Sequence, residues 1–300
     1  MGRLRSLVIA APVLATLVVR SAHADTPAPV EWRWATFEPW EYPVTAAALG
    51  GAIVLRAVGP TPSANWRGGV LGDDWIQSRT ALQSIPQRDH VTRITDYLFY
   101  GAMAYRLVDS AVLPMVVWGK PGVALQLSLI DLESFGFTAI ALWGGQAIFG
   151  RERPFVAHCA DPSFAAFESG CAAGASEHNR SFFAGHPATV FTAAGLTCTH
   201  HAHLPLYGGG APDVLACGLM IGAAAMTAVG REITEKHHTS DVVAGLGVGA
   251  FSGWVLPELL HYGRPRPSAA TADATPPLVR ASVMPRVGPN EAGVAIAGDW

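Results

Sequence analysis

Apolar residues gather in long stretches that shorter polar segments separate. The stretches cover residues 44–58, 98–118, 123–149, 187–199, 214–229 and 241–260. Lys120-Pro121-Gly122 and Pro187 mark helix boundaries, because proline is tolerated in the first turn of a helix and glycine interrupts one. Alternation of apolar and polar residues, which indicates a half-buried strand, is rare. The pattern predicts an all-α fold, a bundle of about six core helices.

The polar segments predict surface elements. Residues 73–97 mix charged and apolar residues, which indicates an amphipathic helix on the domain surface. The acidic pair at its start, Asp73 and Asp74, suits an N-terminal cap better than a catalytic pair. Beyond residue 262 the chain is rich in Pro, Ala and Thr. For this part we expect a small hairpin at 281–297 or a disordered tail.

The N-terminus has the pattern of an export signal. Two arginines precede an apolar run at 7–19, and Ala22-His23-Ala24 fits a cleavage site. An uncleaved anchor helix is the alternative, and either reading places the protein in the cell envelope. The expected divisions are a signal peptide at 1–24, an irregular lead-in at 25–43, a helical domain at 44–262 and a Pro/Ala-rich tail at 263–300.

Composition leaves two environments open for the bundle. Charged residues make up 14% of the chain, against roughly one quarter in globular proteins. With 32 glycines, this favours closely packed helices in a large core or in a bilayer. The net charge of -3 gives no case for nucleic-acid binding. Most apolar stretches are at or below the ~17 residues that a spanning helix needs, so a membrane-embedded bundle and a soluble periplasmic one are both retained.

The cysteines bear on the compartment. Cys159 and Cys171 share a polar loop at 151–180 and could form a disulfide, which requires an oxidising compartment. Cys198 and Cys217 lie in or beside apolar stretches, where free thiols are at least as well supported as a bridge. If the signal is cleaved and three early stretches span, the Cys159 loop lies in the cytoplasm. A cytoplasmic loop conflicts with a disulfide, and three explanations would remove the conflict. One of the early stretches does not span the membrane, the N-terminus is not a cleaved signal, or the whole domain is periplasmic.

Two polar groups lie outside the main motifs. Asp131 and Glu133 fall within an apolar stretch, so each needs a buried partner or a wet groove. The other group has the residue types of a metal site: Cys198, His200, His201 and His203. Its spacing fits no closed zinc pattern, and the alternating layout of the helices puts it at the end opposite the motifs below. Packing and loop contacts are therefore favoured over metal binding.

Three polar segments at the ends of consecutive predicted helices carry the chemistry. The first, QAIFGRERPF, holds Arg151 and Arg153, whose guanidinium groups suit a tetrahedral anion. The second, SFFAGHPA, places Gly185 and His186 at a helix N-terminus, where backbone N–H groups bind anions. His186 there could donate a proton to a leaving oxygen. Alone, each segment is more simply a polar helix end.

The third segment, GREITEKHHTSDVVAG, holds Arg231, His237 and Asp241. His237 and Asp241 are four residues apart, so on a helix they share one face. The carboxylate could then bond one ring nitrogen and leave the other free for chemistry. Arg231 could hold an anion against His237. In an up-and-down bundle all three segments lie at the same end, so we expect them to form one anion site.

This order of segments resembles the signature of the type 2 phosphatidic acid phosphatase and vanadium haloperoxidase superfamily. That signature reads K-x6-R-P, then P-S-G-H, then S-R-x5-H-x3-D. The matching residues are Arg153-Pro154, Gly185-His186, Arg231, His237 and Asp241. His238 is out of register. The resemblance covers roughly residues 98–260 and implies a helical domain with the active site at one end.

Three departures from the signature concern phosphate binding. Gln146 stands where the family has Lys, Phe183-Ala184 replaces Pro-Ser, and Gly230 replaces Ser. Gln146 can donate hydrogen bonds but brings no charge, and Ala184 lacks a hydroxyl. A missing hydrogen bond to the phosphate weakens binding by about 1–3 kcal/mol. The departures predict a weakened or retuned phosphate site, or an inactive one.

The resemblance implies a mechanism without a metal or other cofactor. His237 attacks phosphorus, Asp241 orients it, and His186 protonates the leaving alcohol. The residues expected to bind phosphate are Gln146, Arg151, Arg153, Gly185 and Arg231.

The expected substrate is a lipid phosphate or diphosphate, reached from the membrane with the site facing the periplasm. The alternatives are a soluble periplasmic acid phosphatase, a haloperoxidase that binds vanadate, and a membrane protein of weakened or no activity. No nucleic-acid partner is expected.

Overall fold

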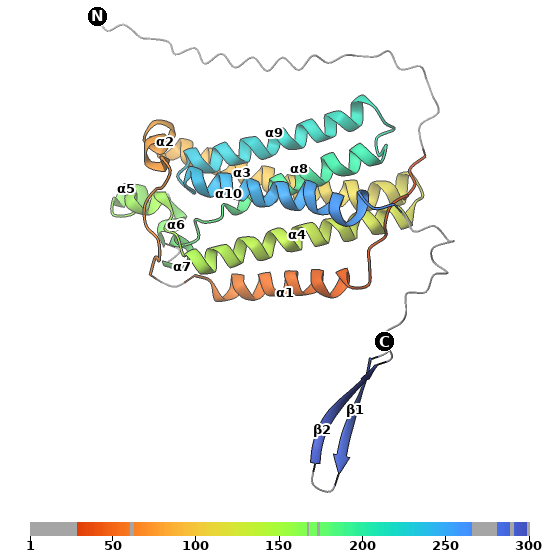
Figure 1. Cartoon of the computed structure of the whole chain (residues 1–300). Helices are drawn as coiled ribbons and strands as arrows, with labels where there is room; N and C mark the ends of the chain where they lie inside the picture. The colour runs from red at the N-terminus through yellow and green to blue at the C-terminus, as the bar shows by residue number, and fades with distance from the viewer. Residues whose placement is uncertain are drawn as a thin grey trace, which may run out of the picture.

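A computed structural model describes residues 29–60, 63–166, 168–172, 175–265, 281–288 and 291–298. Within these residues, six long α-helices run side by side (Figure 1). They are α1 (Glu41–Val58), α3 (Ile85–Leu107), α4 (Pro121–Phe149), α8 (Gly185–His203), α9 (Ala211–Ile233) and α10 (Thr239–Ala250). The predicted all-α bundle is confirmed. The predicted signal peptide at 1–24 lies outside the described residues.

Two helices are longer than their apolar stretches. α3 continues as a π-helical segment, η1 (Val108–Val117), so one element replaces the surface helix and the core helix predicted at 73–118. Only α2 (Asp73–Thr80) remains a separate short helix. α10 continues through η3 (Phe251–Val255) and η4 (Glu258–Tyr262), which carries the helix past Pro257. The change from a charged to an apolar pattern along α3 explains the error, because it makes one continuous helix look like two.

The connections alternate between two ends of the bundle (Figure 1). One, here called the α2 end, carries α2 and the short elements η2 (Pro154–His158), α5 (Pro162–Ala165), α6 (Ser169–Ala172) and α7 (Ala175–His178). The other, the lead-in end, carries residues 29–40, which precede α1 and have an irregular backbone. There Trp34 bridges to Pro265, and the Ala35 amide donates to the Arg264 carbonyl at 3.0 Å.

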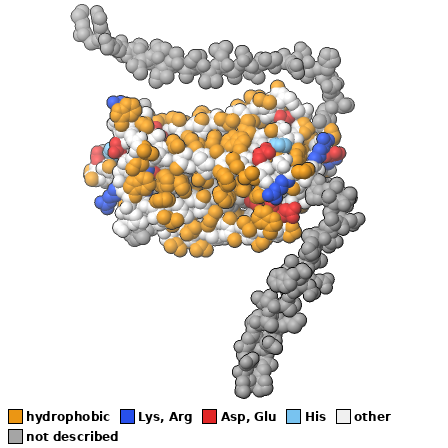
Figure 2. All heavy atoms as spheres, in the orientation of Figure 1, with side chains coloured by type: hydrophobic (Ala, Val, Ile, Leu, Met, Phe, Trp, Pro, Cys, Tyr) orange, Lys and Arg blue, Asp and Glu red, His pale blue; other side chains and the backbone are white. Residues whose placement is uncertain are grey.

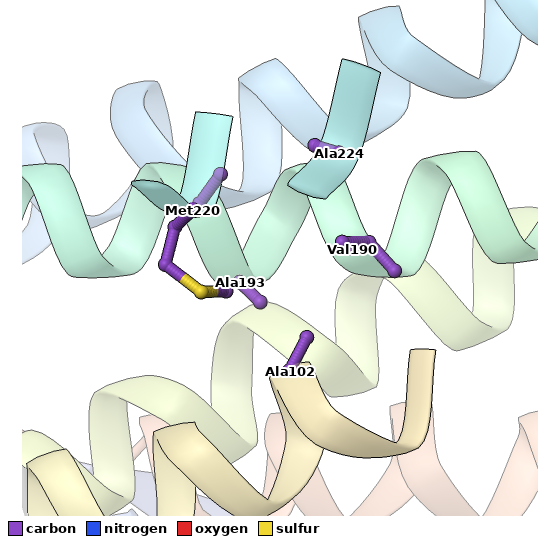
Figure 3. Packing of buried hydrophobic residues seen from close by; sticks show 6 residues of the cluster. Ala102, Val190, Ala193, Met220 and Ala224 are labelled. Atoms are coloured by element: carbon purple, nitrogen blue, oxygen red, sulfur yellow. The ribbon is translucent and has the colours of Figure 1, made fainter. Parts of the chain in front are cut away.

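Small side chains let the helices pack closely. Figure 3 shows Ala102 of α3, Val190 and Ala193 of α8, and Met220 and Ala224 of α9 meeting in one buried cluster. α8 and the last helix approach so closely that a Cβ at Gly249 would lie 2.6 Å from the Ala188 carbonyl oxygen. A larger residue at position 249 would force the two helices apart.

The long surface between the two ends is apolar. Figure 2 shows hydrophobic side chains over the middle of the visible face and charged side chains gathered toward the ends. Three helical segments of the described chain are long and apolar enough to cross a membrane: Pro121–Phe149, Ala211–Ile233 and Thr239–Tyr262. The arrangement is therefore compatible with membrane association.

Near the C-terminus, β1 (Ala281–Gly288) pairs antiparallel with β2 (Glu291–Gly298). Gly288 and Glu291 are partners at one end of the pairing. This is the hairpin that the sequence predicted as one of two alternatives for the tail.

Candidate active site

His237 lies in the short connection between α9 and α10 and is 2% exposed. Its Nδ1 is 2.7 Å from the backbone carbonyl oxygen of Ser181. A carbonyl only accepts, so Nδ1 carries the hydrogen and donates it. The lone pair is then on Nε2, which is the tautomer a nucleophilic histidine needs.

Asp241 does not make the predicted bond to the His237 ring. His237 precedes α10, whereas Asp241 lies in its first turn, so the two are not on one helical face. The Asp241 carboxylate accepts from the Ser181 hydroxyl at 2.5 Å, the His238 backbone amide at 2.9 Å, and the Arg151 guanidinium. It therefore fixes the two backbone segments on either side of the His237 ring and orients that ring indirectly.

Arg151 has a different place from the one predicted. Its side chain is fully buried and forms ion pairs with Asp241 and, at 2.8 Å, with Asp73. It also donates to the Gly68 carbonyl and lies 3.9 Å from the centre of the Trp66 ring. With its charge matched by two carboxylates, Arg151 joins α2 to α10 and has little capacity left for an anion.

Asp73 likewise does more than cap α2. Its carboxylate accepts from the Val70 and Ser240 amides as well as from Arg151. Burial raises its pKa, but these hydrogen bonds outweigh that effect and hold the pKa below the usual value.

Arg231 and His186 meet at a shared carboxylate, that of Asp96 in α3. Asp96 forms an ion pair with Arg231, and its Oδ1 is 3.2 Å from His186 Nε2. His186 also packs on the Phe99 ring at 4.5 Å. The Asp96 side chain is 40% exposed, so this cluster opens to the outside while His237 is closed in. An anionic group thus lies against Arg231, predicted to bind phosphate, and against His186, predicted to protonate the leaving oxygen.

Arg153 faces the site without a carboxylate partner in the described part of the chain. Its closest polar contact is 3.5 Å, to the Lys236 carbonyl, and its Nε is buried without a partner. Burial lowers the pKa of Arg153 to about 10, so the group stays charged at neutral pH. A partly buried cation with so few partners is suited to bind an anion.

The electrostatics of His237 show that the three segments converge. Its pKa is well below the usual value, first because the ring is buried and then because Arg153, Arg231 and His186 are close. A neutral imidazole among cationic groups can attack an anionic phosphate without first losing a proton.

The positions that depart from the signature are packed closely against neighbouring parts of the chain. Gln146 donates to the Phe183 carbonyl at 3.2 Å and leaves its buried Oε1 unpartnered. Gly185 opens α8, and Ala184 before it is fully buried. A Cβ at Gly230 would lie 2.4 Å from Thr95 Cγ2. The serine of the signature therefore does not fit at position 230 unless α3 shifts.

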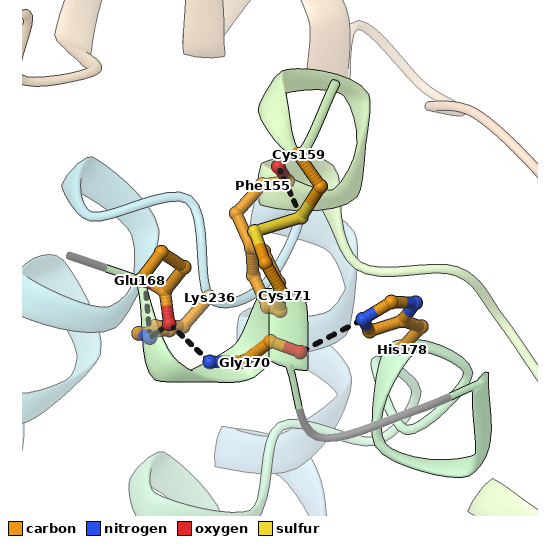
Figure 4. The surroundings of a disulfide bond; sticks show 7 residues. All are labelled: Phe155, Cys159, Glu168, Gly170, Cys171, His178 and Lys236. Carbon is orange, nitrogen blue, oxygen red and sulfur yellow. Dashed lines mark hydrogen bonds and ion pairs between the residues drawn. A yellow bond between two sulfur atoms is a disulfide. The ribbon is translucent and has the colours of Figure 1, made fainter. Parts of the chain in front are cut away.

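A disulfide-bonded loop is anchored beside His237. Cys159 and Cys171 form the predicted disulfide, and Figure 4 shows Glu168 of this loop contacting Lys236. Lys236 Nζ lies 2.6 and 2.7 Å from the two oxygens of the Glu168 carboxylate. Because Lys236 precedes His237, the loop holds the start of the segment that carries His237.

The histidine cluster lies at the lead-in end and is occupied by ion pairs. His200 contacts Asp131 at 3.0 Å, and His201 lies between Asp109 at 3.1 Å and Asp213 at 2.5 Å. Cys198 forms a disulfide with Cys217, a pairing the sequence did not favour over free thiols. These groups therefore pair with one another, and in the described residues they do not form a cluster of metal ligands.

Sequence reasoning missed Asp96, Ser181 and Asp73 as parts of the site. Asp96 is one of several charged residues in a helix that was predicted to be amphipathic, so nothing distinguished it. Ser181 acts mainly through its backbone carbonyl, which residues of every type have. Asp73 shows its role only when α2 packs on α10. None of the three carries a signal that can be recognised without tertiary structure.

Two cavities adjoin these residues. One, of about 400 Å³, is bordered by Arg153, Glu235 and His238. The other, of about 450 Å³, has mainly apolar walls that include Trp66, Ile76 and Phe182.

The segment that contains all three motifs matches a known family. Residues 134–265 match the family model of the PAP2 superfamily. Searches of curated proteins and of solved structures found no significant match.

Proposed function

Because residues 134–265 belong to the PAP2 superfamily, we propose that this protein is a metal-independent phosphatase that acts on lipid phosphates or diphosphates through a phosphohistidine. The observation that carries the proposal is His237, a buried neutral imidazole with Nδ1 bonded to a carbonyl and with the guanidinium groups of Arg153 and Arg231 nearby.

In the proposed first step, Nε2 of His237 attacks phosphorus and the bond to the leaving oxygen breaks. His186 gives its proton to that oxygen, so the alcohol leaves neutral. In the second step water attacks the phosphohistidine, and His186 takes back a proton from the water. Phosphate leaves and both histidines return to their starting states.

Positioning and charge supply most of the catalysis. Arg153 and Arg231 bind the equatorial oxygens, the Gly185 amide at the start of α8 donates to them, and Gln146 adds a neutral donor. Asp241 acts by holding Ser181, whose carbonyl orients His237. For phosphate to reach Arg231, it replaces the Asp96 carboxylate, which then remains beside His186 to support its protonated state.

A lipid substrate is favoured by the surface around the site. The apolar middle of the bundle is compatible with membrane association. The apolar cavity between Trp66 and Phe182 lies at the same end as the motifs. An acyl chain could lie in this cavity while the phosphate occupies the polar site.

The test compares His237→Asn with His238→Asn in the full chain purified in detergent. The neighbouring His238 is equally buried and caps α10, and asparagine retains capping ability. Hydrolysis of p-nitrophenyl phosphate and of a diacylglycerol phosphate should be lost in His237→Asn and kept in His238→Asn. Equal rates in wild type and His237→Asn would overturn the proposal. Halide peroxidation that appears only with added vanadate would indicate a haloperoxidase instead.

A further inference from the structure

A second group of titratable side chains converges at the lead-in end, away from the phosphate site. Glu41 opens α1, Glu133 lies in α4, and His261 lies in η4. One ligand atom from each lies within 4.8 Å of the other two. The three side chains are 0%, 6% and 0% exposed. Because they come from three distant parts of the chain, tertiary packing and not local sequence assembles them.

The charges in this cluster are not balanced by the protein. Among the described residues, no lysine or arginine forms an ion pair with Glu41 or Glu133, and His261 is the ion-pair partner of Glu133. Asp131, two residues earlier on α4, is by contrast paired with Arg106 at 2.9 Å. Two buried carboxylates beside one imidazole are costly unless a cation joins them.

One atom of the cluster that can face the shared centre is buried without a hydrogen-bond partner, Oε1 of Glu41. Buried polar atoms are nearly always paired, so this atom indicates a missing partner.

The spacing of the other atoms suits a shared ion. His261 Nε2 lies 3.1 Å from Glu133 Oε2. Two ligands that each bind one ion at about 2.0–2.2 Å in tetrahedral geometry lie about 3.3–3.6 Å apart. A small movement of either side chain therefore admits an ion between them.

We propose that Glu41, Glu133 and His261 bind a divalent transition-metal ion, with Zn²⁺ as the best fit. Two carboxylate oxygens and one imidazole nitrogen are ligands that Zn²⁺ accepts, whereas Ca²⁺ and Mg²⁺ prefer oxygen alone. The ion balances the two negative charges and ties the start of α1 to α4 and to the end of the last helix.

The surroundings indicate a structural site. The Phe37 ring stacks on His261 at 5.8 Å, and the Phe37 backbone amide donates to Gln126 of α4 at 2.8 Å. The lead-in thus covers the cluster and shields it from water. Because the site is at the opposite end from His237, the ion stabilises the fold and takes no part in phosphoryl transfer.

The experiment measures metal content and thermal unfolding of the full chain purified in detergent without chelator. Wild type should retain about one Zn²⁺ per chain, lose it to dipicolinate, and recover its unfolding midpoint when Zn²⁺ is returned. Glu133→Gln should hold no metal and show no Zn²⁺-dependent midpoint. The matched control is Glu258→Gln, which removes the carboxylate paired with His203 at the same end and should leave metal binding unchanged.

Two results would overturn the proposal. One is wild-type protein that binds neither Zn²⁺ nor Mn²⁺ and gains no stability from either ion. The other is a Glu133→Gln variant that unfolds at a higher temperature than metal-treated wild type, because the cluster would then be held by shared protons. If Glu133→Gln does not fold, Glu41→Gln and chelator-treated wild type give the same comparison.

Discussion

Replacing Arg151 and Arg153 separately distinguishes a residue that supports the site from one that binds the anion. The two arginines are two residues apart and lose the same atoms on mutation to alanine. Arg151→Ala leaves Asp73 and Asp241 as buried carboxylates without their cation. Removing one partner of a buried ion pair costs about 3–5 kcal/mol. For a domain of this size, that lowers the unfolding midpoint by about 6–20 °C.

Arg153→Ala should have the opposite effects. Arg153 makes one weak contact and its charge is already disfavoured by burial, so the unfolding midpoint should stay the same or rise. A lost hydrogen bond to a charged group costs about 1.5–3 kcal/mol. Inhibition by orthovanadate, which copies the phosphate, should therefore weaken about ten- to a hundredfold.

The assay combines thermal unfolding in detergent with vanadate inhibition of p-nitrophenyl phosphate hydrolysis. Arg151→Lys is the intermediate case, because one ammonium group cannot bridge two carboxylates as a guanidinium does. If Arg151→Ala loses vanadate binding and keeps its unfolding midpoint, then Arg151 contacts the anion directly and our interpretation of the Asp73–Asp241 network is wrong.

Three further variants test the site. Gln146→Lys replaces a carboxamide whose oxygen is buried without a partner by the positive charge of the signature, so vanadate should inhibit about tenfold more strongly; unchanged inhibition would place residue 146 outside the anion site. The pKa of His186 lies below the ordinary histidine value because the ring is buried, and Asp96 opposes that effect. As pH rises, the general acid therefore loses its proton earlier than an exposed histidine would, and Asp96→Asn should move the basic limb of kcat/KM to still lower pH. An unchanged pH profile in this variant would contradict the role of Asp96. Gly230→Ser should lower the free energy of unfolding, measured with denaturant, by about 1–3 kcal/mol. Adding Thr95→Ala should recover part of that free energy. If Gly230→Ser alone is as stable as wild type, α3 moves freely enough to admit the serine.

The helices and the order of the motifs could be predicted because they depend on local sequence. Apolar stretches specify helices, and the motif from Arg231 to Asp241 can be recognised from its spacing in the sequence alone. The two arginines of the first motif could not be distinguished, because their difference lies in Asp73 and Trp66, which a separate part of the chain supplies. The orientation of His237 was also hidden, since its partner is a backbone carbonyl and any residue at position 181 would offer one.

Other errors arose from pairings between distant segments. In the first half of α3, Asp96 and Arg88 pair with Arg231 and Glu235 from other elements, whereas Asp89 and Arg93 lie at the surface. Cys198 and Cys217 approach each other only when α8 and α9 pack antiparallel. The buried carboxylate at Asp131 did need a partner, as expected, but nothing in the local sequence identifies that partner as Arg106.

The positions of the two disulfides have a consequence for biogenesis. Cys159–Cys171 lies at the α2 end, and Cys198–Cys217 lies near the lead-in end, between α8 and α9. If the bundle crosses a bilayer, the two bridges face opposite compartments, and the cytoplasm keeps exposed thiols reduced. The redox state of each bridge in the cell would then record the compartment in which that end of the bundle matured. A chain with both bridges closed either folded entirely outside the cytoplasm or sealed Cys198–Cys217 between its helices before reductants could reach it.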